Sequence, residues 1–382
     1  MKLAIIGGGI GGLCAALALR RVGFEPEVFE QAPALLELGA AIAVWPNATR
    51  ILQTLGVGAE LLQRAGLIKQ ARWLNWDGRL LSQFNLPDSR APALALHRAD
   101  LQNALLHALP TQLVHLGKSF LSYHREQDRI RADFTDGTSI TCQVLIGADG
   151  IHSRTRAQAL KDGAPIYRGY TVWRGITAST PASLMPSTAI EVYGRGKRFG
   201  IGPVGLGRTG WWATANELET AEESPNIRQQ KLLDLFEGWH APVIELIKTT
   251  PTTSIRRSST YDRAPVSQWG EGSMTLLGDA AHPMTPNLGQ GGCMAIEDAM
   301  VLAGCLLKYQ NWPEALRVYE SLRIGRTNAV ARYSRRYGMV GQWESGLATW
   351  MRGRILSLAP ESVCEKMLRL LFDYEAEAAT PK

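Results

Sequence analysis

The first thirty residues constrain the fold more than any other stretch of this chain. An apolar strand pattern at 3–6 leads into a G-x-G-x-x-G turn formed by Gly7, Gly9 and Gly12. A helical pattern follows the turn directly, and the next strand pattern ends in Glu30. A strand, a glycine turn, a helix and a second strand in this order predict a Rossmann-like α/β domain.

The same stretch predicts a dinucleotide site. The glycines allow a tight turn and let a pyrophosphate approach the N-terminus of the helix, whose dipole favours negative charge. Glu30 can accept hydrogen bonds from a ribose diol. Because an acid stands there instead of an arginine, an unphosphorylated adenosine ribose is favoured, which means FAD or NAD over NADP.

A second glycine-rich turn lies far along the chain, at 278–292. It follows an apolar strand pattern at 274–277 and precedes a helical pattern at 295–306. Asp279 is then expected just beyond the carboxyl end of a strand, where open α/β sheets bind their ligands. The alternative is a surface loop that is glycine-rich for no functional reason.

A third turn, at 147–156, follows a strand expected over 139–146. Asp149 and Gly150 end that strand, and Ser153 and Arg156 could brace the turn. An acid–glycine pair at the end of a strand again points polar groups toward a ligand.

Two shorter stretches could contact the same ligand. Residues 39–48 read as a loop of small residues followed by a helix, although an ordinary turn fits equally well. Arg98 lies in the first turn of a predicted helix, where a cation is unfavourable for the dipole. A ligand phosphate nearby would explain this arginine, and a solvated side chain is the alternative.

The other elements divide into sheet and helical regions. Between 164 and 269, alternation and glycine turns predict an antiparallel sheet with one helix at 227–239. Its aromatic residues suit a pocket for a flat molecule, with core packing as the default role for most of them. The further predicted strands are 72–84 (a hairpin), 112–116, 118–124 and 129–134, and the further predicted helices lie within 312–336 and 341–372.

Composition excludes several function classes. The 382 residues favour two domains, and no basic run interleaved with aromatics suggests nucleic acid, although the net charge is +6. Five scattered cysteines show no zinc spacing and indicate reduced thiols in the cytoplasm. The uncharged run 3–19 resembles a secretory signal, but its glycines argue against one. No stretch is long enough to span a bilayer.

Taken together, the three turns resemble those of the single-component FAD-dependent monooxygenases, the aromatic hydroxylase family. The resemblance extends to 97–101, 173–175 and 319–326. The segments 284–292 and 341–344 are similar to the branch that holds salicylate hydroxylases, urate hydroxylases, zeaxanthin epoxidases and alkylquinolone hydroxylases. Ala41 departs from the pattern, because relatives often have glycine there.

The resemblance implies roles for individual residues. It places the ADP half of FAD on the first glycine turn, the ribityl hydroxyls on Asp279 and the isoalloxazine beside Pro283. The implied cofactor-binding residues are Gly7, Gly9, Gly11, Gly12, Glu30, Gln31, Ala43, Arg98, Leu121, Asp149, Gly150, Asp279, Pro283, Gly289, Gln290, Gly291 and Gly292. No metal site is expected. His282 is expected to cap or pack and not to act as a base.

The resemblance also implies a reaction. NADH or NADPH would reduce FAD, and O2 would form a flavin C4a-hydroperoxide that hydroxylates an aromatic or heteroaromatic small molecule. Arg198 and Tyr193 are candidates for contact with that substrate, with a solvated turn at 194–197 as the alternative. An epoxidase acting on a polyene or isoprenoid, a non-oxygenating flavin oxidoreductase and a non-catalytic FAD-binding protein remain open. An NAD-dependent dehydrogenase leaves the turns at Asp149 and Asp279 unexplained.

The expected architecture is a discontinuous Rossmann-like FAD-binding domain with an inserted, mainly antiparallel substrate domain and C-terminal helices. We expect a monomer or homodimer. The C-terminal helices could cover the pocket, pair with a subunit or touch a membrane, and packing on the chain's own body is favoured. The predicted boundaries are 1–71, 95–163 and 270–335 for the FAD-binding domain, 72–94 and 164–269 for the substrate domain, and 336–382 for the C-terminal segment.

Overall fold

A five-stranded parallel sheet forms the centre of the N-terminal domain. In the computed structural model, which describes residues 2–34, 40–178, 180–219 and 223–379, its strand order is β18-β12-β1-β2-β8. Two long helices, α1 and α8, pack against each other beside it. The bounds are β1 (Lys2–Ile6), β2 (Glu25–Glu30), β8 (Val114–Leu116), β12 (Val144–Gly147), β18 (Met274–Leu276), α1 (Ile10–Arg21) and α8 (Gly291–Lys308). The predicted Rossmann-like domain is confirmed.

Two three-stranded sheets flank this centre and correct two predictions. Their orders are β3-β7-β4 and β11-β10-β9. The bounds are β3 (Ala41–Val44), β4 (Gly66–Ile68), β7 (Ala93–His97), β9 (Phe120–Glu126), β10 (Arg129–Phe134) and β11 (Ser139–Cys142). The single strand predicted over 139–146 is wrong, because the chain changes sheets at Gln143, whose N–H bonds to the Lys2 carbonyl. The loop predicted over 39–48 is a strand at Ala41–Val44, and Gly39 lies outside the described residues.

The second domain is a seven-stranded sheet in the order β17-β13-β16-β15-β14-β5-β6. All its strand pairs are antiparallel except β14 with β5, so the prediction of a mainly antiparallel sheet is confirmed. The predicted hairpin at 72–84 forms its β5–β6 edge. The bounds are β5 (Gln70–Asn75), β6 (Leu80–Asn85), β13 (Ile166–Thr177), β14 (Thr188–Tyr193), β15 (Lys197–Gly205), β16 (Arg208–Asn216) and β17 (Arg256–Asp262).

The outer face of this sheet is covered by two helices, α6 (Pro225–Leu235) and α7 (Ala241–Thr249). The prediction of one helix over 227–239 is therefore incomplete. Trp173, Phe199 and Trp211 are buried in the core that the sheet shares with these helices. These three aromatic residues consequently fill a core and do not line a ligand pocket, and the ligand-facing surface must be the opposite face.

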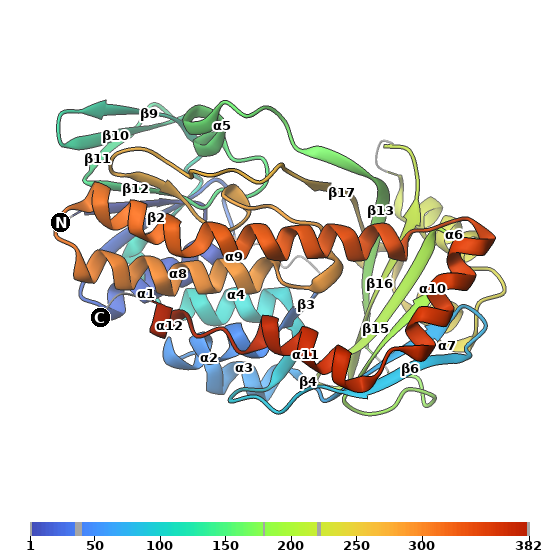
Figure 1. The fold of residues 1–382 in the computed structure, drawn as a ribbon. Helices are drawn as coiled ribbons and strands as arrows, with labels where there is room; N and C mark the ends of the chain where they lie inside the picture. Colours follow the sequence, from blue (N-terminus) through green and yellow to red (C-terminus); the bar gives the residue numbers. More distant parts are fainter. Residues whose placement is uncertain (1, 35–39, 179, 220–222, 380–382) are drawn as a thin grey trace.

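A single long helix ties the two domains together. Figure 1 shows α9 running from the region of the N-terminus to the seven-stranded sheet, where α10 and α11 follow it. Among the described residues, no helix combines the length and apolar character needed to cross a bilayer. The remaining helices are α2 (Pro46–Thr54), α3 (Gly58–Arg64), α4 (Arg98–His107), α5 (Arg154–Leu160), α9 (Trp312–Gly341), α10 (Gly346–Leu358), α11 (Glu361–Phe372) and α12 (Ala376–Ala379).

Candidate functional site

The turn after β1 leaves no room for a side chain at two of its glycines, Gly7 and Gly12. A Cβ on Gly12 would lie 2.0 Å from the Gly7 carbonyl oxygen, and one on Gly7 would lie 2.3 Å from that of Ala148. Gly7 also has φ +110°, which L-side chains rarely adopt. A Cβ on Gly9 would meet no described atom within 4 Å. The N-terminus of α1 is therefore open to a ligand while its flanks are packed tightly.

Glu30 holds this turn in place. Its two carboxylate oxygens accept the N–H groups of Gly8, at 2.6 Å, and Ala32, at 2.9 Å. The Gln102 side chain of α4 donates to the Gly8 carbonyl at 3.1 Å. Because each carboxylate oxygen has a further lone pair, binding of a ribose diol by Glu30 stays compatible with these bonds and stays a prediction.

The turn after β12 is braced as the sequence predicts. Asp149 accepts the hydroxyls of Ser153 and Thr155, both at 2.6 Å, and the Thr155 N–H at 3.1 Å. Ser153 in turn caps α5 by accepting the Arg156 N–H at 2.8 Å. A Cβ on Gly150 would meet no described atom within 4 Å, so this turn also presents open backbone.

Arg156 joins this turn to the one after β18. Its side chain is fully buried. One terminal nitrogen donates to the carbonyls of Ala280, at 2.9 Å, and Ala281, at 2.6 Å, while Asp162 neutralises the guanidinium at 2.6 Å. Two motifs more than a hundred residues apart in the chain are thus held together by one side chain.

Charged side chains gather where these turns meet. Asp279 remains solvent-accessible, but burial by the surrounding elements raises its pKa, which the positive charges of His282 and Arg98 partly offset. Burial and then the charge of Arg98 lower the pKa of Arg174, on β13, to about 10. Arg98, Asp279 and Arg174 therefore act on one small region, as expected for residues around a phosphate-bearing ligand.

The start of α8 lies against β3. Gly289 has φ +62°, and a Cβ there would lie 3.6 Å from that of Ala43. The Trp45 indole donates to the Leu288 carbonyl at 3.1 Å, and a Cβ on Gly292 would lie 3.2 Å from Ile42. The stretch of small residues around Ala43 and the glycines at 289–292, both predicted to contact the cofactor, are thus adjacent.

Three other predicted contacts lie at the edges of this arrangement. Pro283 is buried next to His282, in the turn that links β18 to α8. Gln31 is exposed just beyond β2, and Leu121 of β9 is 54% exposed. Direct contact of these residues with a cofactor stays a prediction.

A buried charged cluster supports the turn at Asp279 from below. His282 lies 2.5 Å from Asp298 of α8, and Asp298 also accepts the Gly278 N–H at 3.1 Å. Burial opposes ionisation of Asp298, but His282 and Arg323 outweigh it and lower its pKa to about 2. His282 is therefore committed to a structural pair, in agreement with the predicted packing role.

Helix α9 completes this cluster. Arg323, fully buried, pairs with Asp298 at 2.7 Å and with Glu297 at 2.8 Å. Arg326 adds a second cation to Glu297 at 2.8 Å, and Asn47 of α2 donates to the same carboxylate at 2.7 Å. Two carboxylates and two guanidinium groups from neighbouring helices thus neutralise one another beneath the start of α8.

Arg198 connects the sheet to the loop before α8. It is 1% exposed, and it donates to Glu191 at 3.0 Å, to Gln342 at 3.0 Å and to Asn287 at 2.5 Å. Asn287 in turn donates to the Tyr170 hydroxyl at 3.0 Å. The alternative of a solvated turn at 194–197 does not extend to Arg198, which is buried between the domains.

Tyr193 belongs to the same network. Its hydroxyl bonds to that of Tyr337 on α9, which donates to Glu191 at 2.7 Å. Burial and then Glu191 raise the pKa of Tyr193 well above its ordinary value, so the phenol is neutral. The sequence analysis assigns no role to Asn287, Glu191, Tyr337 or Gln342, which come from three separate segments. Asn287 and Gln342 lie in the segments that resemble the family branch, but the resemblance does not show that they contact Arg198.

The inner face of the sheet carries small residues beside Arg198. Alternation along β15 puts Gly200 and Gly202 on the face of Arg198, opposite the buried Phe199. The Trp212 ring covers Gly200, and Arg198 stacks over it at 5.3 Å. A Cβ on Gly202 would meet no described atom within 4 Å. This face therefore offers flat open space bordered by a tryptophan and an arginine.

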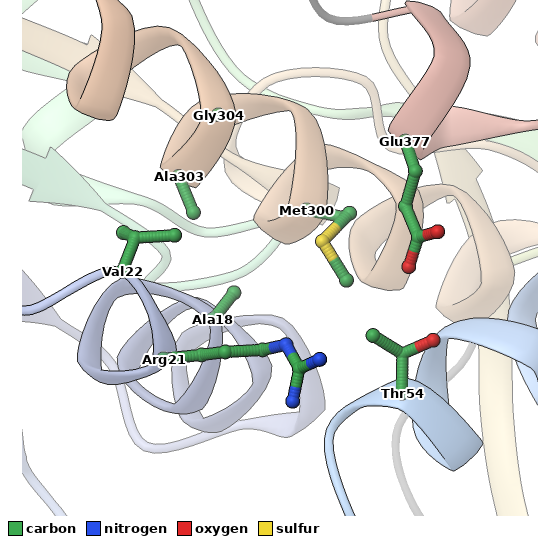
Figure 2. A pocket seen from close by; sticks show the side chains of 8 residues that line it. All are labelled: Ala18, Arg21, Val22, Thr54, Met300, Ala303, Gly304 and Glu377. Carbon is green, nitrogen blue, oxygen red and sulfur yellow. The ribbon is translucent and has the colours of Figure 1, made fainter.

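Two pockets lie near these elements. One, of about 260 Å³, is lined by residues that include Tyr170, Thr285 and Gln342, next to the Arg198 network. The other, of about 360 Å³, lies at the far ends of α1 and α8, where Figure 2 shows Arg21, Met300 and Glu377 around it. None of the predicted cofactor-binding residues lines the larger pocket, so its size does not make it the functional site.

The assembled geometry defines a class of protein. Three turns follow neighbouring strands of a Rossmann-like sheet, β1, β12 and β18, and the loop before α8 reaches the second sheet through Asn287 and Arg198. A Cβ on Gly9 or Gly150 would meet no described atom within 4 Å, so space is open beside these turns. This arrangement fits an extended dinucleotide whose reactive end faces the sheet. Within the described residues, no cluster of three metal-ligating side chains accompanies it.

Comparison with known proteins identifies the family. The family model for an FAD binding domain matches residues 1–334. The aurachin C monooxygenase/isomerase of Stigmatella aurantiaca is 41% identical over 94% of each chain. The 3-amino-4-hydroxybenzoate 2-monooxygenase of Streptomyces cremeus is 38% identical over 88% of this chain and 86% of its own.

A solved structure supports the same assignment. HpxO of Klebsiella pneumoniae, complexed with FAD and uric acid, superposes with a TM-score of 0.90 at 30% identity, covering 100% of this chain and 97% of its own. The chain therefore belongs to the family of FAD-dependent aromatic monooxygenases, and FAD is its cofactor.

Proposed function

We propose that this protein uses NADH or NADPH and O2 to hydroxylate an aromatic or heteroaromatic small molecule. The observation that carries the proposal is the convergence of the turns at Glu30, Asp149 and Asp279 beneath a glycine-lined, tryptophan-bordered sheet face. The names of relatives support it, because those proteins include monooxygenases of aromatic compounds.

The residues at each turn fit the parts of FAD. The open N-terminus of α1 would receive the pyrophosphate, with Glu30 at the adenosine ribose and Arg98 at the phosphates. Asp279 would bind a ribityl hydroxyl. Bound FAD supplies the oxygen-transfer chemistry itself, which no protein side chain provides. The chain's own residues bind it, orient it and exclude water.

The start of α8 would stabilise charge at the ring end of the cofactor. Backbone N–H groups at 289–292 and the N-terminus of an eighteen-residue helix present positive potential there. Pro283 would lie beside the ring. The buried pair of His282 and Asp298 fixes this turn, so the donors need no rearrangement when negative charge develops.

The inner sheet face would receive the substrate. Gly202 leaves room for a planar ring, and Trp212 borders it. Arg198 and Tyr193 would orient the substrate either directly or through Asn287, which Arg198 contacts at 2.5 Å.

The test is oxidation of NADH and NADPH by the FAD-loaded protein against a panel of aromatic acids, purines and quinolones. We expect one class to stimulate oxidation and to yield a product heavier by one oxygen atom, labelled when 18O2 is supplied. Failure to retain FAD contradicts the cofactor assignment. Oxidation that yields only hydrogen peroxide with every compound contradicts the proposed hydroxylation.

Two lesser expectations accompany the proposal. All five cysteines are free and buried, which supports a cytoplasmic location. A monomer or homodimer is expected, and sedimentation velocity distinguishes the two.

A further inference from the structure

Helix α10 exposes apolar side chains to solvent, whereas an ordinary surface helix exposes polar ones. The side chains on its solvent face are apolar and repeat at helical spacing. They are Leu347 (69% exposed), Trp350 (63%), Met351 (44%), Ile355 (59%) and Leu358 (70%). An unpaired surface helix normally exposes polar residues, so this face indicates a partner.

The inner face of α10 is held by polar contacts instead. Arg352 is buried and donates to the Gly341 carbonyl at 2.7 Å, capping the end of α9, and to the Gly194 carbonyl at 2.7 Å. Its guanidinium also stacks over Tyr193 at 5.1 Å. Leu356 adds apolar packing against the cluster that contains Trp73 and Tyr193. The helix is therefore fixed to the body without using its five exposed apolar residues, which stay available outside.

Helix α11 extends the same surface. Val363, Met367 and Leu370 are 58%, 40% and 67% exposed along one flank. The other side of α11 packs inward, where Phe372 stacks on Trp45 at 5.3 Å. We call the eight exposed apolar residues of α10 and α11 the apolar face. Figure 1 shows both helices on the outside of the molecule.

Two cations on the apolar face have no ion-pair partner among the described residues. Arg354 lies in the middle of the α10 stripe and Lys366 borders that of α11, and neither has an ion-pair partner among the described residues. The acids of α11 point to other groups: Glu361 accepts the neutral Asn85 N–H at 3.0 Å, and Glu365 pairs with Arg369 at 2.7 Å.

This combination selects one occupant. A second copy of the chain meeting the α10 stripe about a two-fold axis would bring Arg354 next to its own copy, and α10 itself contains no carboxylate to neutralise the pair. A lipid surface with anionic headgroups instead takes apolar side chains into the acyl boundary, and long cationic side chains reach its phosphates. Tryptophan also favours that depth.

We propose that the apolar face of α10 and α11 binds an anionic membrane surface, with Arg354 and Lys366 at the lipid phosphates. The contact is peripheral, since neither helix enters deeper than its exposed side chains. It holds the sheet that carries Tyr193 close to the lipid, because Arg352 ties α10 to that sheet. The inference is independent of the reaction proposed above.

The test is sedimentation of the full-length FAD-loaded chain with vesicles of phosphatidylcholine alone or mixed with phosphatidylglycerol. We expect binding to the mixed vesicles that weakens with salt. Leu347→Ser, Ile355→Ser and Leu358→Ser together should weaken it by about tenfold or more. The matched control replaces Leu206, Leu218 and Ile227, which are 64%, 84% and 61% exposed elsewhere, and should leave binding unchanged.

The charges are tested separately. Arg354→Gln with Lys366→Gln should weaken binding to mixed vesicles about twenty-five-fold, since each cation near an anionic surface contributes about fivefold. Lys161→Gln with Lys248→Gln, two exposed cations elsewhere, is the control. Trp350→Phe should retain binding but lose part of the fluorescence quenching by brominated lipid.

Three results overturn the proposal. One is a wild-type protein that does not sediment with mixed vesicles. Another is a triple variant that binds mixed vesicles as strongly as the wild type does. The third is a wild-type dimer that the triple variant converts to a monomer, which would assign the face to a second copy. FAD content and NAD(P)H oxidation measured on the same variants separate these results from a failure of the proposed function.

Discussion

The two ends of the candidate site are built from different materials. The proposed cofactor end consists mainly of backbone turns, packed tightly at Gly7 and Gly12 and supported by the buried cluster of His282, Asp298 and Arg323. The substrate end consists of side chains from the seven-stranded sheet, above all Arg198 and Trp212. The cofactor end is supported within one domain, whereas the substrate end depends on contacts between two.

Because the two ends are built differently, we expect the cofactor end to determine the stability of the fold and the substrate end to determine which substrate is accepted. Backbone N–H groups recognise a cofactor shared by a whole family, so the cofactor end can stay the same while substrates differ. Side chains on an open sheet face can change without disturbing the fold. We expect substitutions at the cofactor end to affect folding and FAD together, and those at the substrate end to affect the reaction while FAD stays bound.

The largest expected effect is at Asp298. Asp298→Asn removes a buried carboxylate from Arg323 and His282 and should cost about 3–5 kcal/mol of unfolding free energy at neutral pH. Because the folded pKa is lowered to about 2, this stability is complete above the ordinary pKa and is lost as pH falls toward 2. Urea unfolding from pH 7 down to pH 3 checks both points.

The difference between wild type and variant should shrink as the pH falls. The exposed Asp128→Asn serves as control and should change stability little at any pH. A constant difference between wild type and Asp298→Asn across the range would show that the carboxylate charge is not the cause.

The next effect is at the first glycine turn. A Cβ on Gly12 would lie 2.0 Å from the Gly7 carbonyl, so Gly12→Ala should cost about 3 kcal/mol, which corresponds to about a hundredfold in FAD affinity if the strain falls on the bound form. Gly325→Ala, at an exposed helical position with no described atom within 4 Å of the added Cβ, should gain about 0.5–1 kcal/mol. Titration of the apoprotein with FAD measures the affinity.

A smaller effect on stability is expected at Arg198. Arg198→Gln loses the contacts with Glu191 and Asn287 and should cost about 2 kcal/mol. FAD affinity should stay within about threefold, because Arg198 contacts no cofactor-end turn except through Asn287. Coupling of NAD(P)H oxidation to product should fall strongly.

Tyr193→Phe removes only the hydroxyl bond to Tyr337. It should lower stability and the coupling of NAD(P)H oxidation to product in the same direction as Arg198→Gln, but by less. Unchanged substrate affinity and coupling in both Arg198→Ala and Tyr193→Ala would remove these residues from the substrate site. Loss of FAD in Arg198→Gln would show that the two ends are not separable.

The smallest effect on stability is expected at Gly202. A methyl group there enters open space, so Gly202→Ala should stay within about 0.5 kcal/mol of the wild type, while the KM for an aromatic substrate should change about tenfold. Gly200→Ala is the contrast: its Cβ would lie 2.0 Å from the Trp212 ring, and it should cost about 1–3 kcal/mol. Equal effects of the two variants on KM would place the substrate elsewhere.

The cofactor end was predictable from the sequence because its chemistry is local. A glycine turn between a strand and a helix has to occupy a few consecutive residues, so short patterns are enough to predict the turns that carry Gly7, Asp149 and Asp279. Their contacts with FAD stay predictions. The bracing roles of Ser153 and Arg156 followed from the same turns. The sequence patterns did not show that Arg156 donates hydrogen bonds to the carbonyls of Ala280 and Ala281 in another turn.

The substrate end was decided by tertiary structure. Alternation along a strand shows which residues share a face of the sheet. Only the packing of α6 and α7 shows which face belongs to the core, and this packing places Trp173 and Trp211 in the interior. Arg198 was suspected from its position on a strand. Its partners Asn287 and Gln342 come from other segments, and no spacing in the chain relates them.

The sequence by itself determined the parallel domain, its three ligand-facing turns and the family to which they belong. Tertiary structure alone decided how the two domains meet and that α10 turns its apolar residues outward. The physical reason is the range of the interactions: turns and caps are satisfied within a few residues, whereas the packing of a helix or a sheet face depends on surfaces contributed by distant segments.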